Sequence, residues 1–123
     1  MLREDCFLID ESGGVLWADA GPNASELLDS PARWQAIWRL RARLVEVAHS
    51  HPVGPLAFSK EDETTMAALA AALGRQLRFS VLAPGGMLAR VAGADLLVVE
   101  QPAWAARLRR ESGMALDMNE VQR

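Results

Sequence analysis

The segment from Ser59 to Gly74 constrains the fold most, because it is a helix with a clear start and end. Ser59 is a favourable N-cap, acidic residues fill the first turn, alanine and leucine form the body, and Gly74 follows the last turn. Just upstream, apolar and other residues alternate from Val45 to Ala48, which predicts a strand running into His49. Downstream, the sequence LRFSVLAP predicts a second strand. Strand, loop, helix and strand therefore follow one another in this region.

The first third of the chain predicts a hairpin and a helix. Two short apolar runs, residues 6–9 and 15–17, flank a polar turn that ends in two glycines. After a loop, Ser30 and Pro31 predict a helix start. Trp34, Ile37 and Trp38 have helical spacing and are expected to face the core, with the surrounding arginines in solvent.

The last third predicts further strands and one short helix. Residues 85–101 are typical of one or two strands around a turn at residues 93–95, and residues 102–113 of a helix. The whole order predicts an α/β domain with a single mixed β-sheet flanked by helices. We expect this domain to span residues 1–113 and to be followed by a C-terminal tail at residues 114–123.

The composition excludes several classes of protein. Half of the 123 residues are apolar and the net charge is −3, which is typical of a globular domain and not of a nucleic-acid-binding one. Cys6 is the only cysteine, so no internal disulfide can form and a reducing compartment is expected. No apolar run is long enough to cross a membrane and no secretory signal is visible. We therefore expect a cytoplasmic protein that does not bind membranes.

The two histidines of the chain, His49 and His51, are separated by one residue. If the strand continues through both, their side chains point to the same side and can bind one metal ion. Pro52 ends the strand, and Asp62 follows in the first turn of the next helix, where its carboxylate can face back. Two imidazole nitrogens and one carboxylate oxygen form a common catalytic zinc site, which activates water and polarises a carbonyl group.

The spacing of these residues resembles the signature of the JAMM family, the MPN-plus or JAB-domain zinc metallopeptidases. The pattern is His-Ser-His-Pro, six residues, Ser, two residues and Asp. Its fixed positions are His49, Ser50, His51, Pro52, Ser59 and Asp62. The order of elements over roughly residues 4–100 is also similar to that of the small prokaryotic members. The resemblance implies a cytidine-deaminase-like JAB/MPN architecture.

The resemblance also implies a role for each residue. His49, His51 and Asp62 would bind one Zn²⁺ per chain, and Ser59 would stabilise the oxyanion. Members of the family carry an upstream glutamate that acts as general base, and Glu4 in EDCFLI fits that position. Two other glutamates are weaker candidates: strand alternation places Glu46 opposite His49 as a solvated or salt-bridged residue, and Glu11 lies in the hairpin turn. The family usually has a helix before this glutamate, and only three residues precede Glu4 here.

The function that follows from the resemblance is hydrolysis of a peptide or isopeptide bond by metal-activated water. The substrate would be the C-terminal tail of a ubiquitin-like or sulfur-carrier protein. One alternative is a non-catalytic MPN-type scaffold for protein interactions, and another is a RadC-like member of unclear activity. A simpler interpretation treats the histidines as ordinary polar residues and residues 59–62 as a helix capping box. The oligomeric state does not follow from the sequence.

Overall fold

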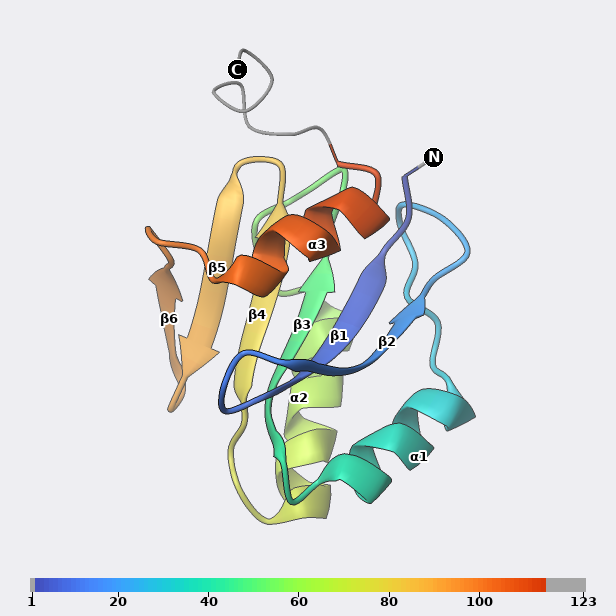
Figure 1. The fold of residues 1–123 in the computed structure, drawn as a ribbon, viewed down its shortest axis with the longest axis vertical. Helices are drawn as coiled ribbons and strands as arrows, with labels where there is room; N and C mark the ends of the chain where they lie inside the picture. Colours follow the sequence, from blue (N-terminus) through green and yellow to red (C-terminus); the bar gives the residue numbers. More distant parts are fainter. Residues whose placement is uncertain (1, 115–123) are drawn as a thin grey trace.

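Six strands form one mixed sheet in the order β2–β1–β3–β4–β5–β6, and the computed structural model describes residues 2–114 (Figure 1). The strands are β1 (Asp5–Asp10), β2 (Val15–Ala20), β3 (Leu44–Ser50), β4 (Arg78–Ala83), β5 (Gly86–Val91) and β6 (Ala94–Leu97). The helices are α1 (Pro31–Leu40), α2 (Lys60–Leu73) and α3 (Ala103–Glu111). Strands β3 and β4 are parallel and joined through α2, whereas the other neighbouring pairs are antiparallel. The predicted α/β class with a single mixed sheet is confirmed.

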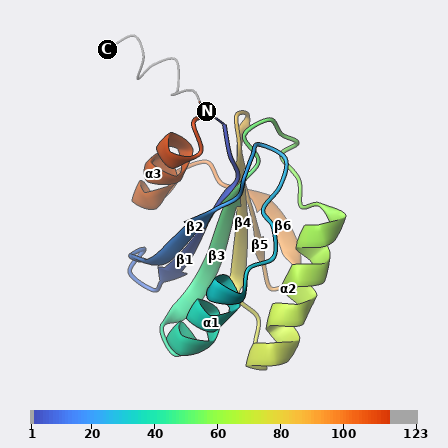
Figure 2. The ribbon, with the colours of Figure 1, turned by 90° about the vertical axis from the view of Figure 1, so that its right-hand side faces the viewer.

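Helices cover both faces of the sheet, with α1 and α2 on one face and α3 on the other (Figure 2). Strand β1 is buried on both sides because its side chains alternate between the two layers. Cys6 and Leu8 pack in the core under α1 and α2, whereas Phe7 and Ile9 pack in the core under α3. The same alternation assigns residue 4 to the α1/α2 face and residue 5 to the α3 face.

The helix ends follow the predicted capping residues. The Ser30 hydroxyl accepts a hydrogen bond from the backbone N–H of Arg33 at 3.2 Å, and Pro31 is the first residue of α1. Ser59 caps α2, which ends at Gly74 with a left-handed φ of 67°. Glycine adopts this conformation without the steric cost that a Cβ atom would add.

Helix α1 differs from the prediction in which side chains it buries. Ile37 is 3% exposed, but Trp38 is 56% exposed, and the Arg41 guanidinium lies 4.0 Å from the centre of its ring. The buried arc of α1 runs through Ala36 and Ile37, and a rotation of about 100° per residue carries Trp38 out of that arc. The expectation that Trp38 faces the core is therefore wrong.

The arginine nearest the start of α1 also differs from the prediction. Arg33 is half-buried and pairs with Asp19 of β2, with 2.7 Å between the guanidinium Nη2 and the carboxylate Oδ2. This pair joins α1 to the edge strand β2, so Arg33 is part of the packing between helix and sheet and not of a solvated face.

The C-terminal third has the predicted strands and helix with a shifted turn. Ala92 and Gly93 form the turn between β5 and β6 with φ values of 51° and 81°, and Asp95 lies inside β6. Met114, which the sequence assigns to the tail, is buried in the core beneath α3. The rest of the expected tail, residues 115–123, lies outside the described residues. Among the helices of residues 2–114, none is long and apolar enough to cross a membrane.

Candidate metal centre

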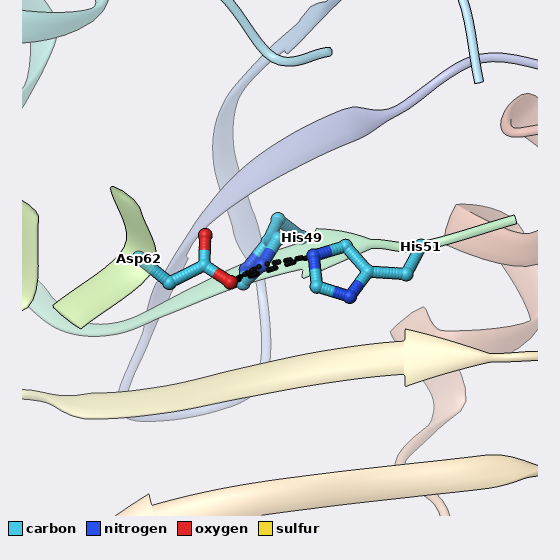
Figure 3. A group of neighbouring side chains, drawn as sticks. All are labelled: His49, His51 and Asp62. Carbon is cyan, nitrogen blue, oxygen red and sulfur yellow. Dashed lines mark hydrogen bonds and ion pairs between the residues drawn. The ribbon is translucent and has the colours of Figure 1, made fainter. Parts of the chain in front are cut away.

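Three side chains meet where the end of β3 approaches the start of α2 (Figure 3). His49 is the penultimate residue of β3, His51 follows the strand, and Asp62 is the third residue of α2. The Nε2 atoms of the two histidines are 3.1 Å apart. Asp62 Oδ2 lies 3.1 Å from His49 Nε2 and 3.4 Å from His51 Nε2. The three predicted ligands therefore present their donor atoms to one point.

These distances fit a zinc ion. Zn²⁺ binds imidazole nitrogen and carboxylate oxygen at about 2.0–2.2 Å in tetrahedral sites, which puts neighbouring donor atoms about 3.3 Å apart. The three donor distances here, 3.1, 3.1 and 3.4 Å, are close to that value. Three protein ligands leave a fourth position for water or substrate, as in catalytic zinc sites.

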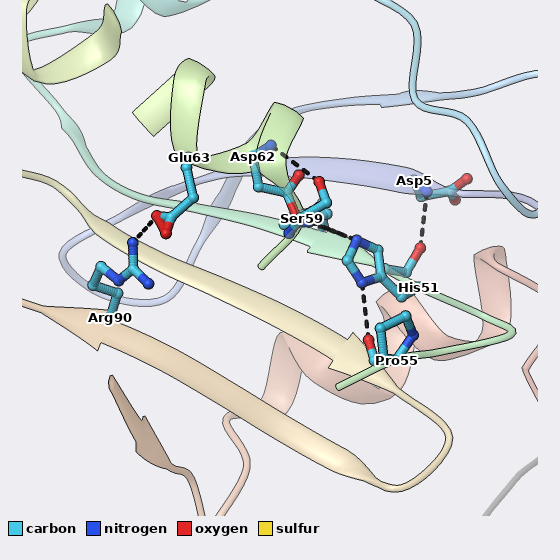
Figure 4. A network of polar contacts seen from close by, with 9 residues as sticks. Asp5, His51, Pro55, Ser59, Asp62, Glu63 and Arg90 are labelled. Atoms are coloured by element: carbon cyan, nitrogen blue, oxygen red, sulfur yellow. Dashed lines mark hydrogen bonds and ion pairs between the residues drawn. The ribbon is translucent and has the colours of Figure 1, made fainter. Parts of the chain in front are cut away.

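The loop after β3 fixes the orientation of His51. Its Nδ1 atom lies 3.0 Å from the carbonyl oxygen of Pro55, so the N–H at Nδ1 donates to that carbonyl (Figure 4). This bond leaves the lone pair on Nε2, which is the atom that faces His49 and Asp62. Gly54, with a φ of 74°, forms the turn that brings Pro55 back to the ring, and its N–H donates to the His51 carbonyl at 2.8 Å.

Asp62 is both a candidate ligand and part of the α2 cap. The Ser59 backbone N–H donates to Asp62 Oδ2 at 2.7 Å, and the Asp62 N–H donates to Ser59 Oγ at 3.0 Å (Figure 4). This is the capping box that the sequence allowed as the simpler interpretation, and it coexists with the contacts to both histidines. Because Ser59 Oγ accepts a bond in the cap, its own hydroxyl hydrogen can still be donated to another group.

The pKa values of Asp62 and His51 reflect the contact between their side chains. Burial acts to raise the pKa of Asp62, but hydrogen bonds from His49 and His51 outweigh it and lower that pKa. Burial acts to lower the pKa of His51, but the hydrogen bonds with Asp62 and the Pro55 carbonyl and the charges of Asp62 and Glu4 together outweigh it and raise that pKa. The pKa values of His51 and Asp62 thus shift in opposite directions, as expected for an imidazole in contact with a carboxylate.

Glu4 lies immediately before β1 and lines the same groove as the three donors. It is 9% exposed, and burial raises the pKa of its carboxyl against the opposing charges of His51 and His49. Its backbone is held by the chain that follows β2: the Glu4 N–H donates to the Asn23 carbonyl, and the Gly21 N–H donates to the Glu4 carbonyl. The structure therefore brings Glu4 to the electrostatic neighbourhood of the histidines.

The other two glutamates occupy different surroundings. Glu46 is buried and accepts hydrogen bonds from Arg78 and from the Ser80 hydroxyl. The salt-bridged interpretation of Glu46 is confirmed, whereas the solvated one is wrong because the parallel neighbour β4 covers it. Glu11 is exposed in the turn at the far end of β1 from Glu4. Of the three glutamates, Glu4 is the one that lines the groove.

A groove of about 850 Å³ leads to the three donors. It is lined by α1, by the start of α2 and by residues 24–29, which follow β2. Cys6 is one of its lining residues and is almost completely buried, and burial raises the pKa of its thiol to about 12, which is typical of an unreactive core cysteine. The sequence did not indicate that residues 24–29 form a wall of the groove, because a loop with little periodicity carries no signal for its packing.

No protein-family model matches this chain, and no curated protein matches it significantly. The inference about the chemistry of this site therefore rests on the identity of the three donor residues and on the distances between their donor atoms.

Proposed function

We propose that this chain is a JAMM-type zinc metallopeptidase with a cytidine-deaminase-like JAB/MPN architecture. Its substrate would be a peptide or isopeptide bond at the C-terminal tail of a ubiquitin-like or sulfur-carrier protein. The observation that carries the proposal is the convergence of His49, His51 and Asp62 at distances that suit zinc, in the lining of a groove. The lone, reduced Cys6 suits a cytoplasmic enzyme.

Zinc bound by these three residues would lower the pKa of a bound water to about 7 and polarise the scissile carbonyl. Glu4 is the group that would take the proton from the water and deliver it to the leaving amine. Its raised pKa suits both tasks, because a base works best when its pKa approaches the working pH. The free hydroxyl hydrogen of Ser59 would stabilise the negative charge that develops on the carbonyl oxygen.

The groove has room for a short extended peptide. At about 850 Å³ it exceeds what a single side chain fills, and apolar side chains of α1 and α2 line it beside the acidic ones. A flexible C-terminal tail can enter such a groove one residue after another. The groove thus supports the tail of a carrier protein as the substrate class.

The first test is the metal content of protein purified without added metal. We expect about one zinc per wild-type chain, no zinc in His51→Ala and unchanged zinc in Glu4→Gln, because Glu4 is not a ligand. The same three proteins are then incubated with a ubiquitin-like C-terminal peptide joined to a fluorogenic amine. The wild type should release the amine, Glu4→Gln should release it only at a small residual rate and His51→Ala not at all, and a chelator should stop the release.

Two results would contradict the proposal. Wild-type protein that neither contains zinc nor binds it on titration would exclude a zinc enzyme and favour the interaction scaffold. Full zinc content with equal peptide cleavage by wild type and Glu4→Gln would remove Glu4 from the mechanism.

A further inference from the structure

Ser50 lies between the two histidines but points to the opposite face of the sheet. It is completely buried, and its side chain is surrounded by groups of β1 and α3 and not by the groove. The Asp5 backbone N–H donates to Ser50 Oγ at 2.8 Å, and the Ser112 hydroxyl donates to the same oxygen. One side-chain atom therefore joins the end of β3 to the start of β1 and to the end of α3.

The bond between the Asp5 N–H and the Ser50 hydroxyl lies where the regular pairing of β1 with β3 would continue. Strands β1 and β3 are in antiparallel register from Asp10 to Cys6, and the last pair is Cys6 with His49. The next pair in that register would be Asp5 with Ser50, but there the Asp5 N–H bonds to the Ser50 hydroxyl. The pair after that would be Glu4 with His51, which are the candidate base and a candidate ligand. Asp5, at one end of the bond, is therefore next to Glu4, and Ser50, at the other end, is next to His51.

The segment that carries Glu4 is held at this point from the α3 side as well. The Arg3 N–H donates to the Ser112 carbonyl at 3.0 Å, and the Arg3 guanidinium donates to the Glu111 carbonyl at 3.1 Å. The same guanidinium pairs with the buried Asp5 carboxylate at 3.0 Å. Figure 4 shows Asp5 on β1 beside the end of β3 that carries His51.

We propose that Ser50, with Ser112 behind it, is a positioning residue that sets the place of Glu4 relative to the metal ligands. This inference rests on the proposed function, since it assigns Glu4 a task that depends on position. Ser50 neither touches the groove nor bonds to a ligand side chain, so it acts through the Asp5 amide. Catalytic groups must be held closely, because a displacement of about 1 Å can cost roughly 100-fold in rate.

The test compares Ser50→Ala and Ser112→Ala with Ser80→Ala. Ser80 is a matched control for Ser50, because both are completely buried strand serines with a hydrogen-bonded hydroxyl, but the Ser80 hydroxyl donates to Glu46. All three variants should lose similar stability. We expect kcat to fall roughly 10- to 100-fold in Ser50→Ala, less in Ser112→Ala, and to stay at the wild-type value in Ser80→Ala. The zinc dissociation constant should change less than about 3-fold, because no ligand loses a hydrogen bond.

A double-mutant cycle separates positioning from general loosening. If Ser50 acts through Glu4, Ser50→Ala should have no further effect on kcat when Glu4→Gln is already present. An equal loss of kcat in both backgrounds would overturn the proposal. So would wild-type kcat in Ser50→Ala, or a zinc affinity that falls in step with kcat.

Hydrogen exchange of the metal-free protein tests the anchor without any activity. In Ser50→Ala the Asp5 amide should exchange at least about 10-fold faster than in Ser80→Ala, while the amides of residues 47–49 keep their protection. An unchanged exchange rate of the Asp5 amide would show that the Ser50 hydroxyl does not hold it in place. Because this measurement needs neither zinc nor substrate, it tests the bond between Ser50 and the Asp5 amide even if the wild type fails the zinc test above.

Discussion

Asp62 combines two tasks in one carboxylate, since a single oxygen accepts from the Ser59 amide and faces both histidines. Asp62→Asn keeps an oxygen that can cap α2 but removes the negative charge that a metal needs. We expect zinc affinity to fall by roughly 100-fold or more while helix content is retained. Competition with a zinc-binding dye measures the affinity, and circular dichroism measures the helix.

Glu61→Gln is the matched control for this change. Glu61 is an exposed acid in the same first turn, and the Glu61→Gln variant should bind zinc as tightly as the wild type does. Wild-type zinc affinity in Asp62→Asn would show that Asp62 is only a helix cap.

Asp5 is a buried carboxylate whose ionisation opposes folding. Burial raises its pKa, and the nearby Arg3 offsets only part of that shift. A carboxyl with a raised folded-state pKa gives its full stabilisation below the unfolded value of about 3.9 and loses it as the pH rises through the folded pKa. We therefore expect Asp5→Asn to raise the free energy of unfolding by up to about 1 kcal/mol at pH 7, with the gain disappearing near pH 3.

Urea unfolding of wild type and Asp5→Asn at several pH values measures this difference. Glu11→Gln, a substitution in the exposed turn, should leave the wild-type pH dependence unchanged. A less stable Asp5→Asn at pH 7 would mean that the ion pair with Arg3 outweighs the cost of burial.

At the scale of the elements, the two serine caps offer a matched comparison. Ser30 caps α1 and Ser59 caps α2, each through one bond from its hydroxyl to a backbone N–H of the first turn. Replacement of either by alanine should lower the free energy of unfolding by about 1 kcal/mol. Only Ser59→Ala should also weaken zinc binding, because Ser59 Oγ holds the backbone N–H of Asp62, whereas Ser30 Oγ holds the backbone N–H of Arg33.

Chemical denaturation and zinc titration of the two cap variants make this comparison. Equal zinc affinities would show that the histidines and the rest of α2 hold Asp62 in place without the cap.

The elements and the proximity of His49, His51 and Asp62 were predictable because their signals are local. The two histidines and Asp62 lie within 14 residues, on a strand end and a helix start that capping and alternation already indicate. Trp38 was wrongly assigned to the core because helical spacing shows which apolar side chains share one side of α1. It does not show which of them face the sheet, because that depends on how α1 packs against it. Neighbouring positions on a short helix can therefore exchange core for solvent with a small rotation.

The contacts that join distant parts of the chain were not predictable. Ser112 is 62 residues from its partner Ser50, and no pattern in the sequence relates the two. The wall of the groove formed by residues 24–29 depends likewise on how the chain after β2 packs beside Glu4. Such contacts follow from the assembled sheet, in which β1 lies between β2 and β3.

At the scale of the whole molecule, zinc bound at the proposed site should stabilise the fold, because the candidate ligands come from the end of β3 and from α2. A ligand that binds only the folded state adds about 2.7 kcal/mol at a free concentration 100 times its dissociation constant. We expect the Tm to rise by several degrees when zinc is added to metal-free wild type, and not to change in His51→Ala. The four tryptophans allow the transition to be followed by intrinsic fluorescence. Equal rises in Tm in the wild type and in His51→Ala would show that zinc binds at a site that does not include His51.

The bond between Ser50 and Ser112 has a consequence for a chain emerging from the ribosome. All three candidate metal donors have been synthesised by residue 62, whereas the hydroxyl that bonds to Ser50 arrives only with Ser112. The residues of the candidate metal centre are therefore made 50 residues before the side chain that completes the contact of Ser50. A chain that stops before α3 would keep all three donors in its sequence but lack the Ser112 hydroxyl.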